Sequence, residues 1–242
     1  MYSEIDARLQ HPFTCLVSGP SQAGKSTLVS DIIRKQHRLI NVPFEYVTIF
    51  LGTPVESNGV YLKLHQDLPH LVKLVDVNAK YPTKEDIKER FSADIKKHIK
   101  SYNGKPGCLI FDDLMKELGS SGSILLELFT KLCSHHNLSS IHITQNLFAK
   151  GAGCSDHTTL YRNSMYIILF ESRLDNTVIS HIARRIAAGG TSSSLQQMLD
   201  YIVKKHRYVL ISGSLNTPKE IQFRTDITAD EPYVYQRVFQ LI

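Results

Sequence analysis

Cysteine is scarce in this sequence and is not arranged for disulfide or metal chemistry. The four cysteines are scattered and form no Cys-x-x-Cys pair: Cys15, Cys108, Cys133 and Cys154. Cys15 and Cys108 lie inside apolar runs, where a cysteine usually behaves as a small core residue. Cys133 precedes His135 and His136, but no second ligand pair follows at zinc spacing. We therefore expect reduced thiols in an intracellular protein rather than a disulfide framework or a zinc site.

Long apolar segments and targeting signals are also lacking. No apolar run approaches the roughly 18 residues that a membrane-spanning helix needs. The segment MYSEIDARLQHPF is mixed and charged, without the apolar centre of a signal peptide. Charged residues make up 21% of the chain and no low-complexity tract occurs, so disorder is not expected. These absences predict a soluble protein with no membrane partner.

The length and composition fit a single folded domain. The chain has 242 residues, of which 42% are hydrophobic, so a sizeable core can form. Because no repeat and no clear linker occurs, we assign residues 1–242 to one domain. The net charge of +5 is compatible with a nucleic-acid partner, but many basic domains bind none.

Short apolar runs alternate with amphipathic segments along the chain. We predict strands at 13–18, 46–51, 71–77, 108–112, 139–144 and 165–170. Helices are predicted at 25–36, 83–100, 122–136, 176–187 and 195–203, a loop at 151–159, and a terminal hairpin at 208–212 and 220–225. This alternation predicts an α/β fold: a mostly parallel central sheet flanked by helices, with a C-terminal β-hairpin.

A phosphate-binding loop follows the first predicted strand. The sequence G-P-S-Q-A-G-K-S matches G-x-x-x-x-G-K-[ST] at every fixed position and opens a predicted helix. Its backbone N–H groups would converge on a phosphate at the helix N-terminus, Lys25 would reach the β- and γ-phosphates, and the Ser26 hydroxyl would bind Mg²⁺. The residues assigned to nucleotide binding are Gly19, Pro20, Ser21, Gln22, Ala23, Gly24, Lys25, Ser26 and Thr27.

An acid pair ends a later strand and is suited to the second half of such a site. In CLIFDDLM, Asp112 closes the strand and is expected to hold Mg²⁺ through water. Asp113 stands where many ATPases place a catalytic Glu, and Glu117 offers a longer carboxylate as an alternative. Two strand candidates separate the loop from this pair, which favours a strand inserted between the two strands in the sheet.

A polar residue at the end of the next strand is a candidate γ-phosphate sensor. Gln145 follows the strand 139–144, and the carboxyl ends of strands in an open α/β sheet face the ligand crevice. Gln145 would contact the γ-phosphate or orient water. The alternative is that Asn146 and its neighbours simply cap the next turn.

Four segments, in this order, resemble the DNA-packaging ATPases of the FtsK–HerA superfamily: GPSQAGKST, LIFDDLMKE, LFTKLCSHHNLSSIHITQNLF and YRNSMYIILFESRLD. The likeness is to the branch found in poxvirus-like and adenovirus-like DNA viruses and in Maverick/Polinton transposons. It implies a RecA-like P-loop core, ATP and Mg²⁺ as cofactors, and a homo-oligomeric ring. It also implies translocation of double-stranded DNA into a capsid, with capsid proteins as partners, in the host nucleus or at a site of virion assembly.

The resemblance also implies an arginine supplied by a neighbouring subunit, because charge on the transferred phosphoryl group needs a donor that arrives on closure. Arg162 precedes the strand 165–170 and Arg173 follows it, and both remain candidates. Candidate DNA contacts are the basic segments 96–100 and 204–207, which are equally compatible with solvated helix ends. The alternative functions are a regulatory or helicase-type P-loop NTPase and, less favoured, a nucleotide kinase.

Overall fold

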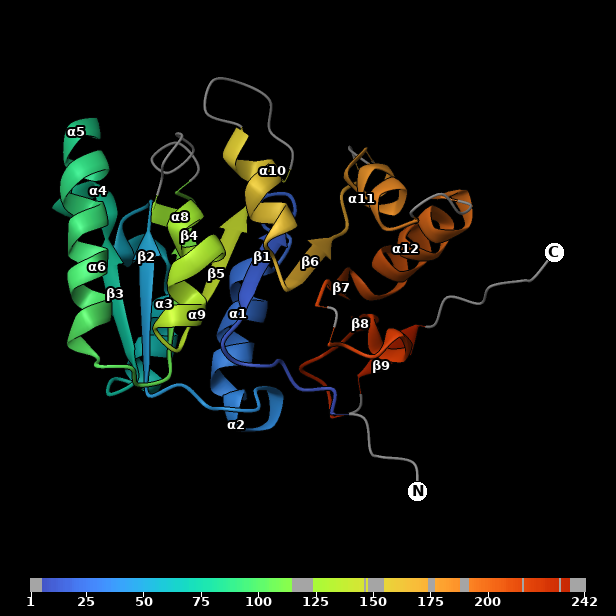
Figure 1. Ribbon diagram of the computed structural model, residues 1–242, viewed down its shortest axis with the longest axis horizontal. Coiled ribbons are helices and arrows are strands. Elements are labelled where there is room, and N and C mark those ends of the chain that lie inside the picture. Colours follow the sequence, from blue (N-terminus) through green and yellow to red (C-terminus); the bar gives the residue numbers. More distant parts are fainter. Residues whose placement is uncertain are drawn as a thin grey trace.

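The computed structural model describes residues 6–114, 124–145, 147, 155–173, 177–187, 192–214, 216–230 and 232–235. All of its strands belong to one nine-stranded sheet with the order β3-β2-β4-β5-β1-β6-β7-β8-β9 (Figure 1). The strands are β1 (Thr14–Ser18), β2 (Tyr46–Leu51), β3 (Val72–Asp76), β4 (Gly107–Asp112), β5 (Leu138–Thr144), β6 (Tyr166–Phe170), β7 (Tyr208–Ser212), β8 (Phe223–Thr225) and β9 (Tyr233–Tyr235).

The sheet is parallel over most of its width. Strands β3, β2, β4, β5, β1 and β6 pair in parallel, whereas β7, β8 and β9 are antiparallel additions. All residues of β1, β2, β5 and β6 are buried, as expected for strands covered on both faces. The mostly parallel α/β sheet and the β7–β8 hairpin are therefore confirmed.

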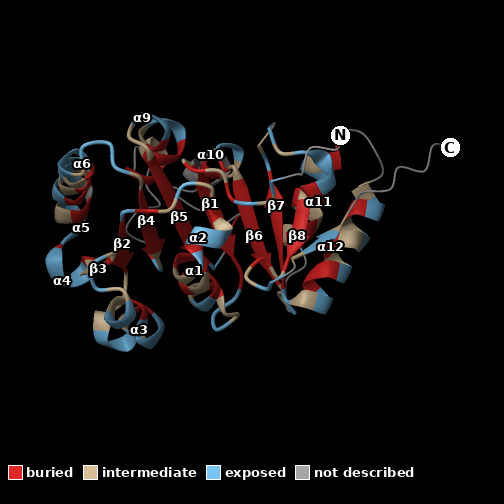
Figure 2. Ribbon diagram, turned by 90° about the horizontal axis from the view of Figure 1, so that it is seen from below, coloured by how far each residue is buried: buried red, intermediate tan, exposed pale blue. Residues whose placement is uncertain are grey.

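Helices cover both faces of the sheet (Figure 2). Among the described residues they are α1 (Lys25–Arg34), α2 (Gln36–Leu39), α3 (Gly59–Asp67), α4 (Val77–Lys80), α5 (Lys84–Asp86), α6 (Ser92–Ser101), α8 (Ile124–Glu127), α9 (Cys133–His135), α10 (Ser155–Arg162), α11 (Thr177–Ala187) and α12 (Ser192–His206). Apolar side chains of α1 and α3 pack on one face, and those of α6, α8, α11 and α12 pack on the other. Two apolar layers thus enclose the sheet and fix the ends of its strands.

Several element boundaries differ from the prediction. The predicted helix 83–100 is continuous, but Ile87–Phe91 (η2) is a π-helical stretch between α5 and α6. The predicted loop at 151–159 is wrong at its end, because α10 begins at Ser155. In the hairpin, Lys219–Ile221 forms a short 3₁₀ helix, so β8 starts only at Phe223, and β9 was not predicted.

The described cysteines are buried thiols. Cys15, Cys108 and Cys133 are free, and burial raises the pKa of each above its ordinary value. Cys154 lies outside the described residues. This agrees with the expectation that Cys15 and Cys108 act as core residues.

Within the described part of the chain, no helix combines the length and the apolar character that crossing a membrane requires.

Candidate nucleotide-binding site

The phosphate loop connects the end of β1 to the start of α1 at the carboxyl edge of the sheet. Gly24 caps α1 with a left-handed φ of 96°, a conformation that glycine adopts without strain. A Cβ atom on Gly19 would lie 2.5 Å from the Cβ of Phe170 at the end of β6, so this position also requires glycine. The Gly19 N–H donates to the Thr144 carbonyl at 3.3 Å, which ties the loop to the end of β5.

Lys25 directs its ammonium group into this loop. Its Nζ donates to the carbonyl oxygens of Gly19 at 2.8 Å and Pro20 at 2.7 Å, and the residue is only 9% exposed. Burial lowers the pKa of Lys25, while the nearby carboxylates of Asp112 and Asp113 act in the opposite direction. A positive charge is thereby held at the centre of the loop, where the β- and γ-phosphates of a bound nucleotide would lie.

The fold brings the acid pair against the phosphate loop. The Ser26 hydroxyl donates to Asp112 Oδ2 at 2.8 Å, although the two residues are far apart in sequence. Strand β5 lies between β1 and β4, so the predicted inserted strand is confirmed by the sheet order. Burial raises the pKa of Asp112, and the hydrogen bonds from Ser26 and Tyr61 together with the charge of Lys25 oppose this rise.

The Ser26–Asp112 pair has the chemistry that a magnesium ion requires. A hydroxyl and a carboxylate oxygen are hard ligands, and Mg²⁺ commonly uses one or two protein oxygens together with water and substrate phosphates. No group of three or more His, Cys, Asp or Glu side chains suited to a metal occurs among the described residues. A magnesium ion at this position would therefore depend on the nucleotide's own phosphates, and Ser26 and Asp112 fit that arrangement.

Tyr61 is a site residue that no motif in the sequence indicated. It lies on α3 and is fully buried, and its hydroxyl donates to the same Asp112 Oδ2 at 2.8 Å. Burial, reinforced by Asp112, raises the pKa of Tyr61, which keeps the phenol protonated as a donor. Asp112 therefore accepts from two hydroxyls on different helices, and this fixes the orientation of its carboxylate.

Replacing Tyr61 with phenylalanine tests this positioning role. The variant keeps the ring in the core but removes one donor from Asp112, so we expect turnover of ATP to fall about tenfold. The apparent affinity for Mg²⁺ should also fall, and a magnesium titration of turnover would measure it. A lower turnover with an unchanged magnesium dependence would contradict a role in orienting Asp112.

Asp113 and Gln145 face each other beside this pair. The Gln145 amide Nε2 donates to Asp113 Oδ1 at 3.4 Å, and Asp113 adopts a left-handed φ of 57°. A Cβ on Gly52 would lie 2.0 Å from the Asp113 carbonyl oxygen, so glycine is needed at the end of β2. A polar hollow of about 160 Å³ here is lined by Ser21, Gln22, Lys25, Ser26, Thr53, Asn58, Asp112, Asp113, Ile143, Thr144 and Gln145. Glu117 lies outside the described residues.

The two candidate arginines lie at opposite ends of β6. Arg162 ends α10, is exposed, and precedes β6 at the amino edge of the sheet, away from the phosphate loop of its own chain. Arg173 follows β6 at the carboxyl edge and lines a hollow together with the phosphate loop of its own chain. The structure therefore does not bring the two arginines together: Arg173 lies beside the phosphate loop of its own chain, and Arg162 lies at the opposite edge of the sheet.

The two basic segments do not form continuous charged faces. In 96–100, Lys96 pairs with Glu127 at 2.7 Å, and Ile99 is buried. In 204–207, the His206 ring bonds to Asp226 at 2.7 Å and Tyr235 at 2.8 Å. Each segment therefore mixes exposed basic side chains with paired or buried ones, and its contact with DNA stays a prediction.

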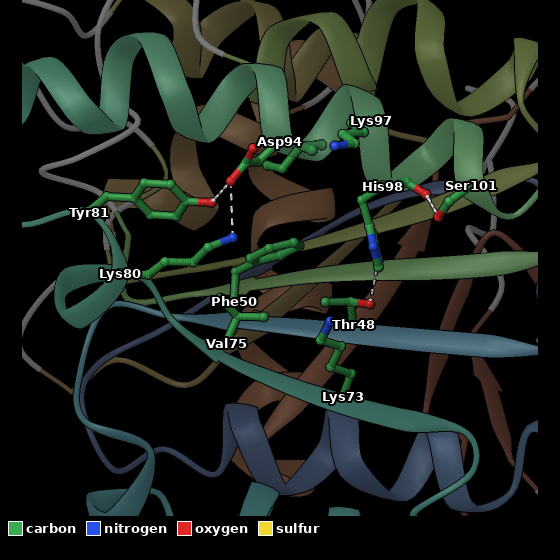
Figure 3. A pocket seen from close by; sticks show the side chains of 11 residues that line it. Thr48, Phe50, Lys73, Val75, Lys80, Tyr81, Asp94, Lys97, His98 and Ser101 are labelled. Atoms are coloured by element: carbon green, nitrogen blue, oxygen red, sulfur yellow. Dashed lines mark hydrogen bonds and ion pairs between the residues drawn. The ribbon is translucent and has the colours of Figure 1, made fainter.

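Lys97 and His98 of the first segment line a separate cavity of about 310 Å³ between α6 and the β2–β3 edge (Figure 3). The His98 Nε2 bonds to the Thr48 hydroxyl at 2.8 Å on one side. On the other side, Asp94 accepts from the hydroxyl of Tyr81 at 2.7 Å and the ammonium of Lys80 at 3.0 Å. This cavity is remote from the phosphate loop in the sheet order.

The buried ring of His98 in this cavity predicts that the stability of the protein depends on pH. Burial, followed by the charges of Lys73 and Lys80, lowers the pKa of His98 below its ordinary value. Below about pH 6.5 the unfolded chain takes up a proton that the folded chain resists, so the free energy of unfolding falls as the pH drops. We expect His98→Gln to weaken this dependence in urea unfolding at about pH 7.5 and 5.5. Burial also lowers the pKa of His11, so the variant should keep part of the decrease in unfolding free energy between the two pH values. A decrease as large as that of the wild type would contradict the assignment to His98.

Solved structures resemble this fold over nearly its whole length. The genome packaging NTPase B204 from Sulfolobus turreted icosahedral virus 2, in complex with AMP, is 15% identical in sequence. The match covers 94% of this chain and 98% of that chain, with a TM-score of 0.54. The chain therefore shares its fold with B204.

A second neighbour shows how general this architecture is. The KaiC-like protein PH0186 from Pyrococcus horikoshii OT3 is 12% identical, covers 93% of this chain and 90% of its own, and gives a TM-score of 0.50. No family model matches the sequence, and no curated protein matches it. The predicted RecA-like P-loop fold is confirmed by these neighbours.

Proposed function

We propose that this chain is an ATPase of the FtsK–HerA superfamily that uses ATP hydrolysis to move double-stranded DNA, packaging viral or virus-like DNA into a capsid. The observation that carries the proposal is the hydrogen bond between Ser26 on α1 and Asp112 on β4, with β5 between their strands. The ordered motifs of the sequence and the fold shared with B204 support the same conclusion.

The residues of the site suggest how hydrolysis would proceed. Lys25 and the loop N–H groups bind the β- and γ-phosphates, and Ser26 and Asp112 would hold Mg²⁺, which neutralises phosphate charge and orients the γ-phosphate. Asp113, which accepts a hydrogen bond from Gln145, would accept a proton from the attacking water. The Gln145 amide would contact the γ-phosphate or orient the attacking water, since it lines the same hollow as Lys25 and Ser26.

The arrangement within a ring is part of the proposal. Arg162 lies away from the phosphate loop of its own chain, which suits an arginine that completes a neighbouring subunit's site. Capsid proteins are the proposed docking partners, and the host nucleus or a site of virion assembly is the proposed location.

ATP turnover measured with and without double-stranded DNA tests the function. We expect DNA to stimulate turnover, and mass measurement to show a ring under the same conditions. A chain that remains monomeric and turns over ATP at a rate independent of DNA would contradict the motor and favour a regulatory NTPase. Single-stranded DNA as the better stimulator would favour the helicase-type alternative.

A further inference from the structure

A second, larger hollow lies beside the phosphate loop, on the side away from the acid pair. Its volume is about 600 Å³, against about 160 Å³ for the hollow at Asp112 and Asp113. One wall is the loop segment 20–23, and the opposite wall is formed by Phe170, Glu171, Ser172, Arg173 and Arg207. In the sheet, β4 and β5 lie on one side of β1, and β6 and β7 lie on the other.

The loop separates these two hollows and contributes to both. Ser21 and Gln22 line each of them, whereas Lys25 and Ser26 line only the smaller one. A nucleotide whose terminal phosphates lie against Lys25 and Ser26 fills the smaller hollow with those phosphates. Its α-phosphate and nucleoside then extend across the loop toward the larger hollow, which has the volume to hold them.

Arg207 is positioned at this hollow by its backbone. It adopts a left-handed φ of 71° just before β7, and its carbonyl oxygen accepts from the Glu171 N–H at 2.7 Å. This hydrogen bond joins the end of β6 to the start of the adjacent strand β7, beside the phosphate loop. Within the described ranges its guanidinium group forms no ion pair or hydrogen bond, so the exposed side chain is available to a ligand.

Arg173 brings a second guanidinium group to the same hollow. Its side chain is 88% exposed, and its Nε atom lies 3.9 Å from Glu171 Oε1. Among the described residues that line the hollow, two guanidinium groups meet one carboxylate, so this lining carries a net positive charge. A guanidinium group binds phosphate oxygens in a bidentate manner and stacks on flat aromatic rings, so both halves of a nucleoside monophosphate suit this wall.

We infer that Arg173 and Arg207 bind the α-phosphate and nucleoside of the nucleotide held by the phosphate loop of their own chain. The inference rests on the proposed function only in requiring that a nucleotide binds at this loop, and it needs neither hydrolysis nor DNA. Arg173 then acts in the nucleotide site of its own chain, and Arg162 is the candidate arginine for the site of a neighbouring subunit.

AMP is the probe that isolates this half of the site, because it lacks the β- and γ-phosphates. Calorimetric titration of wild type, Arg173→Ala and Arg207→Ala with AMP should show about a tenfold loss of affinity in each variant, the effect of one charged hydrogen bond. Arg184→Ala, at an exposed arginine on α11, serves as the matched control and should bind AMP as wild type does. Unchanged affinity in both variants, or no AMP binding by wild type, would overturn the inference.

Two further measurements separate this inference from its alternatives. Lys25→Ala should weaken ATP binding but leave AMP binding unchanged, so failure of hydrolysis or of DNA stimulation does not affect the result. Mixing Lys25→Ala with Arg173→Ala chains, at an ATP concentration low enough for weaker binding to limit the turnover of Arg173→Ala, tests whether the arginine acts in its own chain. Recovery of turnover in the mixture would show that a neighbour supplies Arg173 and would overturn its assignment, whereas we expect no recovery.

Discussion

Replacing Lys25 with alanine is expected to reduce ATP turnover by roughly a hundredfold to a thousandfold, the usual loss for a preorganised charge at a reacting phosphate. The change removes the ammonium group that the Gly19 and Pro20 carbonyls hold at the centre of the loop. A coupled assay of phosphate release would measure it, with circular dichroism to verify that the fold persists.

Lys63→Ala is the control for this experiment. Lys63 is an exposed lysine on α3, and its loss should leave turnover unchanged. Retained hydrolysis by Lys25→Ala would remove the phosphate-loop assignment altogether. Loss of hydrolysis accompanied by unfolding would instead point to a structural role for the two carbonyl contacts.

Asp112→Asn is the second variant with a large expected effect. Its amide oxygen can still accept from Ser26 and Tyr61, but the negative charge needed to hold Mg²⁺ is lost, so we expect turnover to fall about a hundredfold or more. Nucleotide binding without magnesium should persist, because the phosphate loop is intact. Phosphate release and nucleotide titration together measure the two effects.

The same variant makes a prediction about stability. Burial raises the pKa of Asp112, which means that the folded protein bears a cost for the ionised carboxylate. A neutral amide of the same shape should therefore leave the thermal midpoint equal or higher while activity is lost. Asp86→Asn, at a carboxylate on the surface of α5, is the control and should retain turnover. A marked drop in the midpoint for Asp112→Asn would contradict this account of the site.

The sequence was sufficient for those parts of the site that depend on local pattern. The loop from Gly19 to Ser26 must follow a strand and open a helix, and both elements have strong apolar patterns. A strand between β1 and β4 was also predicted, but the two strand candidates that separate the motifs in sequence are β2 and β3, and only the fold shows that the inserted strand is β5. The roles of the individual site residues remain predictions for the variants to test.

Other parts depend on contacts between distant segments, which a single sequence does not reveal. Tyr61 reads as one more apolar position on the buried face of α3, and only the fold shows its hydroxyl at Asp112. Arg207 follows two lysines and a histidine and so looked like part of a charged surface. A left-handed turn before β7 places it at the nucleotide loop instead. Burial of His206 between Asp226 and Tyr235 is likewise a consequence of tertiary packing.

The sheet order has a consequence for how the chain acquires its structure during synthesis. Strand β1 is made early, but its two neighbours are β5 and β6, which end at Thr144 and Phe170. The loop after β1 is supported by those same two residues, through the Gly19 N–H and the close packing of Gly19. Because such distant pairings form slowly and chains emerge from the ribosome N-terminus first, the phosphate loop gains the support of both neighbouring strands only after Phe170 has emerged.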